Sequence, residues 1–114
     1  MSLKIYHNPR CSKSRQTLQI LQENSADFQI IEYLKNIPTE LELRSILKEL
    51  NINAEDLIRK GEAIYKENFK GKNLTNEEWI SAMVEHPKLI ERPIVSNGKS
   101  AVIGRPPEKV LELI

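Results

Sequence analysis

The only cysteine of this chain, Cys11, lies where a thiol would be reactive. It follows the turn signal Asn8-Pro9 and comes just before a segment with helical periodicity that begins at Ser12. The free N–H groups and the positive dipole end of such a helix favour the thiolate over the thiol. Two cations, Arg10 and Lys13, flank the cysteine. The position therefore predicts a nucleophilic cysteine rather than a buried structural one.

Two nearby side chains are candidates to support that thiolate. Ser14 completes the pattern Cys-x-x-Ser; its hydroxyl can donate a hydrogen bond to the sulfur, but it cannot resolve a mixed disulfide as a second cysteine would. A redox cycle at Cys11 must therefore use a thiol from another molecule. His7 is either a proton acceptor or orienting group for the cysteine or a satisfied histidine at a strand end, and spacing alone does not distinguish the two.

Three arginines stand at the boundaries of expected elements: Arg59, Arg92 and Arg105. An arginine fork matches a tetrahedral oxyanion bidentately, which lysine does not. Arg92 and Arg105 lie at opposite ends of an expected hairpin, so their side chains can converge beside one end of a sheet. Taken singly, each arginine is also typical of a solvated surface.

The first part of the chain has the order strand, helix, strand. Alternation predicts a strand over 3–7, helical periodicity runs from Ser12 to Asn24-Ser25, and an apolar run over 28–34 predicts a second strand that lies centrally in a sheet. This order implies a right-handed crossover between parallel strands.

The middle of the chain is predicted to be helical. Two capping boxes, each a threonine followed three residues later by a glutamate, predict helices that begin after Thr39 and Thr75. Asn53 is a candidate cap for a short helix between them. The polar segment 66–72 is expected to be irregular.

The last part of the chain predicts a hairpin and a helix. Two β-rich runs over 94–103 flank Asn97-Gly98, the pair favoured by a type I′ turn. A final helix is expected over 108–114. The whole order matches an α/β, thioredoxin-like fold with a mixed four-stranded sheet and an inserted helical middle segment. In that fold a cis proline precedes the third strand, and Pro93 is the candidate.

Composition sets the remaining expectations. The 114 residues suit one domain, 1–114, and the 17 basic and 16 acidic residues nearly cancel, so no overall field favours nucleic acid or an anionic membrane. A single cysteine forms no internal disulfide, and no Cys/His cluster predicts a metal site. No signal peptide precedes Lys4 and no segment is long and apolar enough to span a bilayer. We expect a reduced, cytoplasmic monomer.

Four separated blocks, taken together, closely resemble the glutaredoxin-linked arsenate reductase family (ArsC type), in a short bacterial branch. The blocks are Tyr6-His7-Asn8-Pro9-x-Cys11-x-x-Ser14-Arg15-x-Thr17-Leu18, Leu57-Ile58-Arg59-Lys60, Arg92-Pro93-Ile94-Val95 and Arg105-Pro106. They run from the first strand to the last helix, so the resemblance covers essentially the whole chain. It implies a thioredoxin/glutaredoxin-like fold and the reduction of arsenate to arsenite.

The resemblance also implies roles. Cys11 corresponds to the nucleophile, His7 and Ser14 to residues that support its thiolate, and three arginines to the oxyanion pocket, namely Arg59, Arg92 and Arg105. In the implied reaction the thiolate attacks arsenic, glutathione adds to the arseno-enzyme, and glutaredoxin reduces the adduct. No cofactor is bound, and glutathione is a co-substrate.

Two other functions remain open from the sequence. A monothiol glutaredoxin-like oxidoreductase would use the same cysteine on mixed disulfides, but a disulfide needs no oxyanion clamp. A non-enzymatic regulator of the Spx type shares this fold and binds RNA polymerase. Such regulators usually carry Cys-x-x-Cys, whereas this chain has Ser14.

Overall fold

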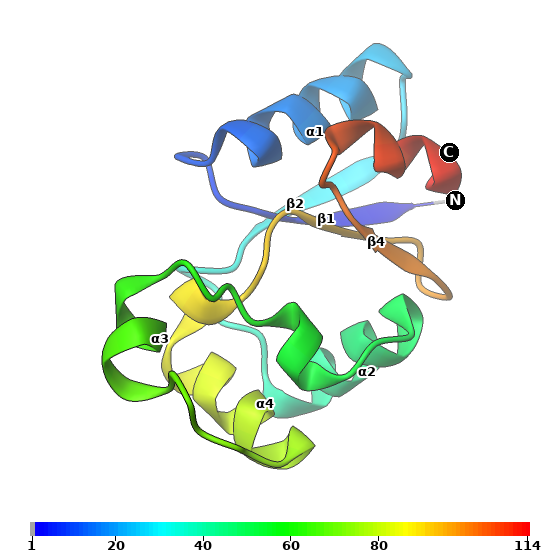
Figure 1. The fold of residues 1–114 in the computed structure, drawn as a ribbon. Helices are drawn as coiled ribbons and strands as arrows, with labels where there is room; N and C mark the ends of the chain where they lie inside the picture. The colour runs from blue at the N-terminus through cyan, green and yellow to red at the C-terminus, as the bar shows by residue number, and fades with distance from the viewer. Residues whose placement is uncertain (1) are drawn as a thin grey trace. The chain divides into compact units, whose positions relative to one another are not determined.

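Both ends of the chain contribute to one four-stranded sheet with the strand order β2-β1-β3-β4 (Figure 1). A computed structural model describes residues 2–114 and divides them into two compact units. The first unit runs to Asn36, resumes at Arg92 and ends at Ile114, and it contains the sheet. The second unit is Ile37–Glu91.

The sheet is mixed, as the sequence predicts. β1 (Leu3–His7) pairs in parallel with β2 (Phe28–Glu32), and α1 (Ser12–Glu23) connects these two strands. On its other side β1 pairs antiparallel with β3 (Ile94–Ser96), which pairs antiparallel with β4 (Ala101–Ile103). β4 therefore runs in the same direction as β1.

Two helices cover one face of this sheet, α1 and the C-terminal 3-10 helix η3 (Pro107–Leu113) (Figure 1). The expected final helix is thus present, but as a 3-10 helix. Apolar side chains of both helices and of the strands form one core, and burying them supplies the main stabilisation of the unit. Its buried members are Leu3, Ile5, Leu21, Val95 and Val110.

The prediction that the second strand lies centrally was wrong. β2 ends at Glu32 and is an edge strand, with β1 as its neighbour in the sheet. Ile30, in the middle of the strand, is 46% exposed. An apolar run shows that a segment favours β structure, but it does not determine which strands become its neighbours.

The hairpin is present, but its expected type I′ turn at Asn97-Gly98 is not. That turn needs positive φ at both central residues. In the structure Gly98 has φ of +91°, while positive φ outside glycine occurs, within residues 2–114, at Ser25 and Asn51. The loop is longer, because Ser96 pairs with Ala101 and the N–H of Asn97 bonds the carbonyl of Ser100. Asn97 therefore begins the turn instead of occupying its centre.

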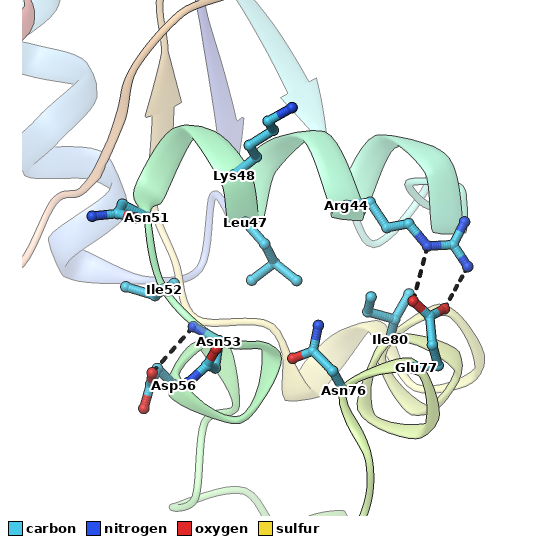
Figure 2. Close-up of a pocket in the computed structure, with 10 residues that line it drawn as sticks. All are labelled: Arg44, Leu47, Lys48, Asn51, Ile52, Asn53, Asp56, Asn76, Glu77 and Ile80. Atoms are coloured by element: carbon cyan, nitrogen blue, oxygen red, sulfur yellow. Dashed lines mark hydrogen bonds and ion pairs between the residues drawn. The ribbon is translucent and has the colours of Figure 1, made fainter.

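The second unit is helical, as predicted, and both capping boxes are confirmed. Thr39 caps α2 (Glu40–Leu50) and Thr75 caps α4 (Asn76–Glu85). Arg44 on α2 and Glu77 on α4 form a two-pronged ion pair at the rim of a cavity of about 460 Å³ (Figure 2). The pair joins the two helices across the apolar side chains of Leu47 and Ile80, which also line this cavity.

Shorter elements complete this unit. Asn53 precedes the 3-10 helix η1 (Ala54–Leu57), as predicted, and its N–H bonds Asp56. A second 3-10 helix, η2 (Pro87–Leu89), follows α4. The expectation of an irregular segment over 66–72 was wrong in part, because α3 (Ala63–Asn68) reaches into it. No residue of α3 is buried. A helix that buries no face needs no apolar residues at helical spacing, which is the pattern that would have predicted it from the sequence.

Candidate active site

Cys11 is the N-cap residue of α1, immediately before the first helical residue. Its backbone is extended (φ −92°, ψ 123°), and its N–H donates to the carbonyl of Asn8 at 3.0 Å. This hydrogen bond closes a tight turn over Asn8-Pro9-Arg10-Cys11, in which proline holds the position that suits its fixed φ. The turn therefore delivers the cysteine, half-buried, to the helix start.

Backbone N–H groups of the first turn of α1 and arginine side chains lie around the Cys11 sulfur. Burial alone would raise the pKa of the Cys11 thiol, but the N–H of Ser14, the guanidinium of Arg92 and the N–H of Lys13 outweigh it. The net effect lowers the pKa of Cys11 below its ordinary value. Hydrogen bonds and positive charge favour the thiolate over the thiol. The predicted activation of the cysteine is therefore supported by its surroundings.

Sheet topology brings the two arginines of the hairpin to the same place. Arg92 precedes β3 and Arg105 follows β4, and Ile94 pairs with Ile103. Because β4 runs parallel to β1, the end of β4 lies at the end of β1 from which the Cys11 turn departs. Arg105 Nη2 donates to Cys11 Sγ at 3.6 Å, and Arg105 Nε donates to the carbonyl of Arg92 at 2.9 Å. The predicted convergence of this pair is confirmed.

A proline follows each of these arginines. The Arg92–Pro93 peptide bond is cis, so Pro93, the candidate from the sequence, is a cis proline before β3, and the Arg105–Pro106 bond is cis as well. Arg92 is only 8% exposed, so its guanidinium is held inside the protein beside the sulfur.

His7 and Ser14 are paired with each other. His7 Nδ1 lies 2.6 Å from Ser14 Oγ, and Ser14 Oγ also accepts the N–H of Asn8 at 3.1 Å. The expectation that the serine hydroxyl donates to the thiolate is not what the structure shows, because that hydroxyl pairs with His7, and it is the backbone N–H of Ser14 that lowers the pKa of Cys11. Burial lowers the pKa of His7, with Glu32 opposing and Arg15 assisting. A direct catalytic role for either side chain stays a prediction.

The remaining candidate, Arg59, belongs to the second unit. It follows the β-bridge between Ile58 and Ile90, and its Nε lies 3.9 Å from Glu62 Oε1. Its part in oxyanion binding stays a prediction. The cations that flank Cys11, Arg10 and Lys13, are exposed. The Lys13 backbone N–H, not its ammonium group, supports the sulfur.

This arrangement suits nucleophilic attack on an anion. Two fixed guanidinium groups and the N–H groups of a helix start act on one atom, the Cys11 sulfur, and favour its thiolate form. Across residues 2–114 no group of three or more His, Cys, Asp and Glu side chains could hold a metal ion. Within the same residues no helix has the length and hydrophobicity to cross a membrane.

Sequence reasoning missed the part that Asn8 plays in this site. Its carbonyl, its N–H and its side-chain oxygen all make hydrogen bonds within residues 10–14. An asparagine three residues before the cysteine indicates a turn. It does not reveal that the turn also holds Ser14, because that bond uses the backbone of Asn8.

Comparisons with known proteins agree with this geometry. The ArsC family model matches residues 6–113. The arsenate reductase of Haemophilus influenzae is 49% identical over the full length of both chains, and the uncharacterised YfgD protein of Escherichia coli K12 is 52% identical over 98% of this chain and 96% of its own. The solved arsenate reductase of Vibrio cholerae is 47% identical, with a TM-score of 0.93 over 100% of this chain and 98% of its own.

Proposed function

Because this chain belongs to the ArsC family, we propose that it reduces arsenate to arsenite, with the Cys11 thiolate as nucleophile and with glutathione and glutaredoxin as thiol partners. One observation carries the proposal. The sulfur that would attack accepts hydrogen bonds from Arg92 and Arg105, and the N–H groups of Lys13 and Ser14 in the first turn of α1 lower its pKa. Such a cluster of donors suits a small tetrahedral oxyanion bound against the thiolate.

In the first step the thiolate attacks arsenic. A sulfur–arsenic bond forms, an arsenic–oxygen bond breaks, and the departing hydroxide leaves as water once it takes a proton. Arsenic remains in its pentavalent state. Arg92 and Arg105 stabilise the negative charge of the arsenate oxygens during this exchange, and their fixed positions avoid reorganisation at the moment of reaction.

Reduction requires two electrons, which two thiols supply when they form one disulfide. Cys11 is the only cysteine, so the thiols come from other molecules. Glutathione displaces a second oxygen as water and forms an arsenic–sulfur bond. A glutaredoxin thiol then attacks the glutathione sulfur and breaks the arsenic–sulfur bond to glutathione. The electron pair of this bond passes to arsenic, which becomes trivalent, and the mixed disulfide of glutathione and glutaredoxin leaves. Water releases arsenite from Cys11 and restores the thiol.

The proposed thiol partners indicate the cell compartment in which this chemistry takes place. Glutathione-dependent reduction needs a compartment that keeps thiols reduced, so we place the protein in the cytoplasm. A monomer is proposed as its working form. Arg59 is proposed as a third oxyanion ligand. A related small oxyanion with the same tetrahedral shape would meet the same guanidinium donors, and arsenate is preferred because the relatives from Haemophilus influenzae and Vibrio cholerae are named arsenate reductases.

The test is an assay of arsenite formation from arsenate with purified glutathione and glutaredoxin. We expect turnover that needs both thiol partners and is abolished by Cys11→Ser. Arsenite at or below the level of that variant would overturn the arsenate assignment. A parallel assay of glutathione mixed-disulfide reduction tests the oxidoreductase alternative. Rapid disulfide reduction without arsenite formation would favour that activity.

A further inference from the structure

We infer that Asn8 is a positioning residue that sets the reactivity of Cys11 by holding the turn before α1. The inference rests on Cys11 being the reactive thiol of the proposed function. Its test reads the thiol itself, so it succeeds or fails independently of arsenate turnover.

Three polar atoms of Asn8 make hydrogen bonds with residues 10–14, the segment that carries Cys11. Its side-chain Oδ1 accepts the N–H of Arg10 at 3.0 Å, and its carbonyl accepts the N–H of Cys11 at 3.0 Å. Its own N–H donates to Ser14 Oγ at 3.1 Å. Asn8 is 9% exposed, so these bonds are made largely out of water, where an unpaired polar group is costly.

These hydrogen bonds determine which backbone N–H groups remain available to the Cys11 sulfur. Asn8 takes the N–H groups of Arg10 and Cys11, which precede the helix. The N–H groups of Lys13 and Ser14, in the first turn of α1, then face the sulfur and lower the pKa of Cys11. The turn also receives a second clamp, because Arg15 Nη1 donates to the carbonyl of Pro9 at 3.0 Å.

Asparagine is the side chain that suits this position. The asparagine Oδ1, bonded to the γ carbon, reaches the N–H two residues later and closes a turn. Aspartate offers the same oxygen, but its negative charge would lie in the same turn as the thiolate and raise the thiol pKa. Serine offers a shorter and weaker acceptor. A neutral amide combines the required reach with no charge.

The experiment is the pH profile of Cys11 alkylation by iodoacetamide in folded protein. Asn8→Ala removes the acceptor, so we expect the Cys11 pKa to rise by about one unit, which lowers the rate at pH values below both pKa values about tenfold. Asn8→Ser should recover part of the shift. Asn8→Asp should also raise the pKa, and added salt should reduce that shift by screening the charge.

The chain offers a matched control in Asn97. Its Oδ1 accepts the N–H groups of Lys99 and Ser100 in a similar turn of the same unit. That turn follows Ser96, which pairs with Lys4, so it lies at the end of the sheet opposite to Cys11. Asn97→Ala should leave the Cys11 pKa unchanged.

Two outcomes would overturn the inference. One is a wild-type Cys11 pKa in folded Asn8→Ala, or in Asn8→Leu, which also lacks the acceptor, if the alanine variant does not fold. The other is an equal rise of the pKa in Asn8→Ala and Asn97→Ala, since that would reflect general loosening. A protein that forms no arsenite but shows the Asn8-specific shift would refute the proposed function and leave this inference standing.

Discussion

Arg105 donates a hydrogen bond from Nη2 to the Cys11 sulfur at 3.6 Å while its Nε donates to the carbonyl of Arg92 at 2.9 Å. The planar guanidinium can make both bonds at once because its donors form a rigid fork. Arg92 bonds the same sulfur. The backbone of one arginine therefore fixes the side chain of the other, and both meet the one atom that is to react.

The first prediction is that Arg105→Lys lowers kcat/KM for arsenate about 10²- to 10³-fold, although the positive charge is kept. A lysine ammonium cannot bond the Arg92 carbonyl and reach the sulfur with the same fixed geometry. Steady-state arsenite formation measures the effect. The Cys11 pKa from alkylation should also rise, because a charged donor to the thiolate is displaced.

A control variant for this test is Lys99→Ala, which removes one positive charge from an exposed position in the β3–β4 loop. Its kcat/KM should match the wild type. If Arg105→Lys also retained wild-type kcat/KM, the guanidinium geometry would have no part in catalysis.

The second prediction concerns pH and stability at Cys11. The pKa of this thiol is lowered in the folded protein, so the folded state loses its proton at lower pH than the unfolded state. Between the folded pKa and about 8.5 the unfolded state binds more protons, and stability therefore rises with pH in that window. The contribution is complete above about 8.5 and is lost as pH falls through the folded pKa.

Urea denaturation of the wild type and of Cys11→Ser, in the presence of a reductant, tests this prediction. The difference in free energy of unfolding should grow in favour of the wild type as pH rises through the window. A difference that is constant with pH would show that the folded and unfolded thiols have the same pKa.

The sequence predicts local elements well because their signals are local. Both capping boxes, at Thr39 and Thr75, are found as expected, since a cap depends on residues three apart. The position of β2 at the sheet edge is set by the other strands, which lie far away in the chain. α3 packs no buried residue, so its sequence carried no periodic pattern to detect.

The site divides in the same way. Cys11 and the convergence of Arg92 with Arg105 were predictable from residue types and from hairpin topology. The activation of the sulfur by N–H groups of a helix start was predictable as well, and the structure assigns it to Lys13 and Ser14. The pairing of His7 with Ser14 depends on how the turn after β1 folds back.

The third prediction concerns acid sensitivity at His7. Burial lowers the pKa of His7, despite the opposing charge of Glu32 and with the help of Arg15. The unfolded histidine, with an ordinary pKa of 6.5, therefore takes up a proton before the folded one does. Stability is consequently lost as pH falls from about 6.5 through the folded pKa.

His7→Asn removes this group and should reduce the loss of stability between about pH 7.5 and pH 5.5, which lie one unit either side of an ordinary histidine pKa, measured by urea denaturation. Glu32→Gln should have the opposite effect, because Glu32 raises the His7 pKa and its removal lowers that pKa further. Parallel stability curves for the wild type and His7→Asn would contradict the prediction.

The fourth prediction is that Gly104→Ala destabilises the protein by about 1–3 kcal/mol, the usual cost of overpacking. A Cβ on Gly104 would lie 2.5 Å from Thr17 Oγ1 and 2.8 Å from Pro93 Cγ, so α1 and the segment before β3 would both have to move. Those two segments carry Cys11 and Arg92, and the variant should therefore also raise the Cys11 pKa.

A double-mutant cycle with Thr17→Ala separates the two contacts of Gly104. Removing Oγ1 relieves the closer clash but leaves Pro93, so the double variant should recover part of the lost stability, and the two effects should be non-additive. Gly61→Ala is the matched control, because nothing lies within 4 Å of a Cβ built there and its φ is not positive. Stability changes that were equal for Gly61→Ala and Gly104→Ala would show that backbone freedom, rather than the close approach of α1, explains the glycine at 104.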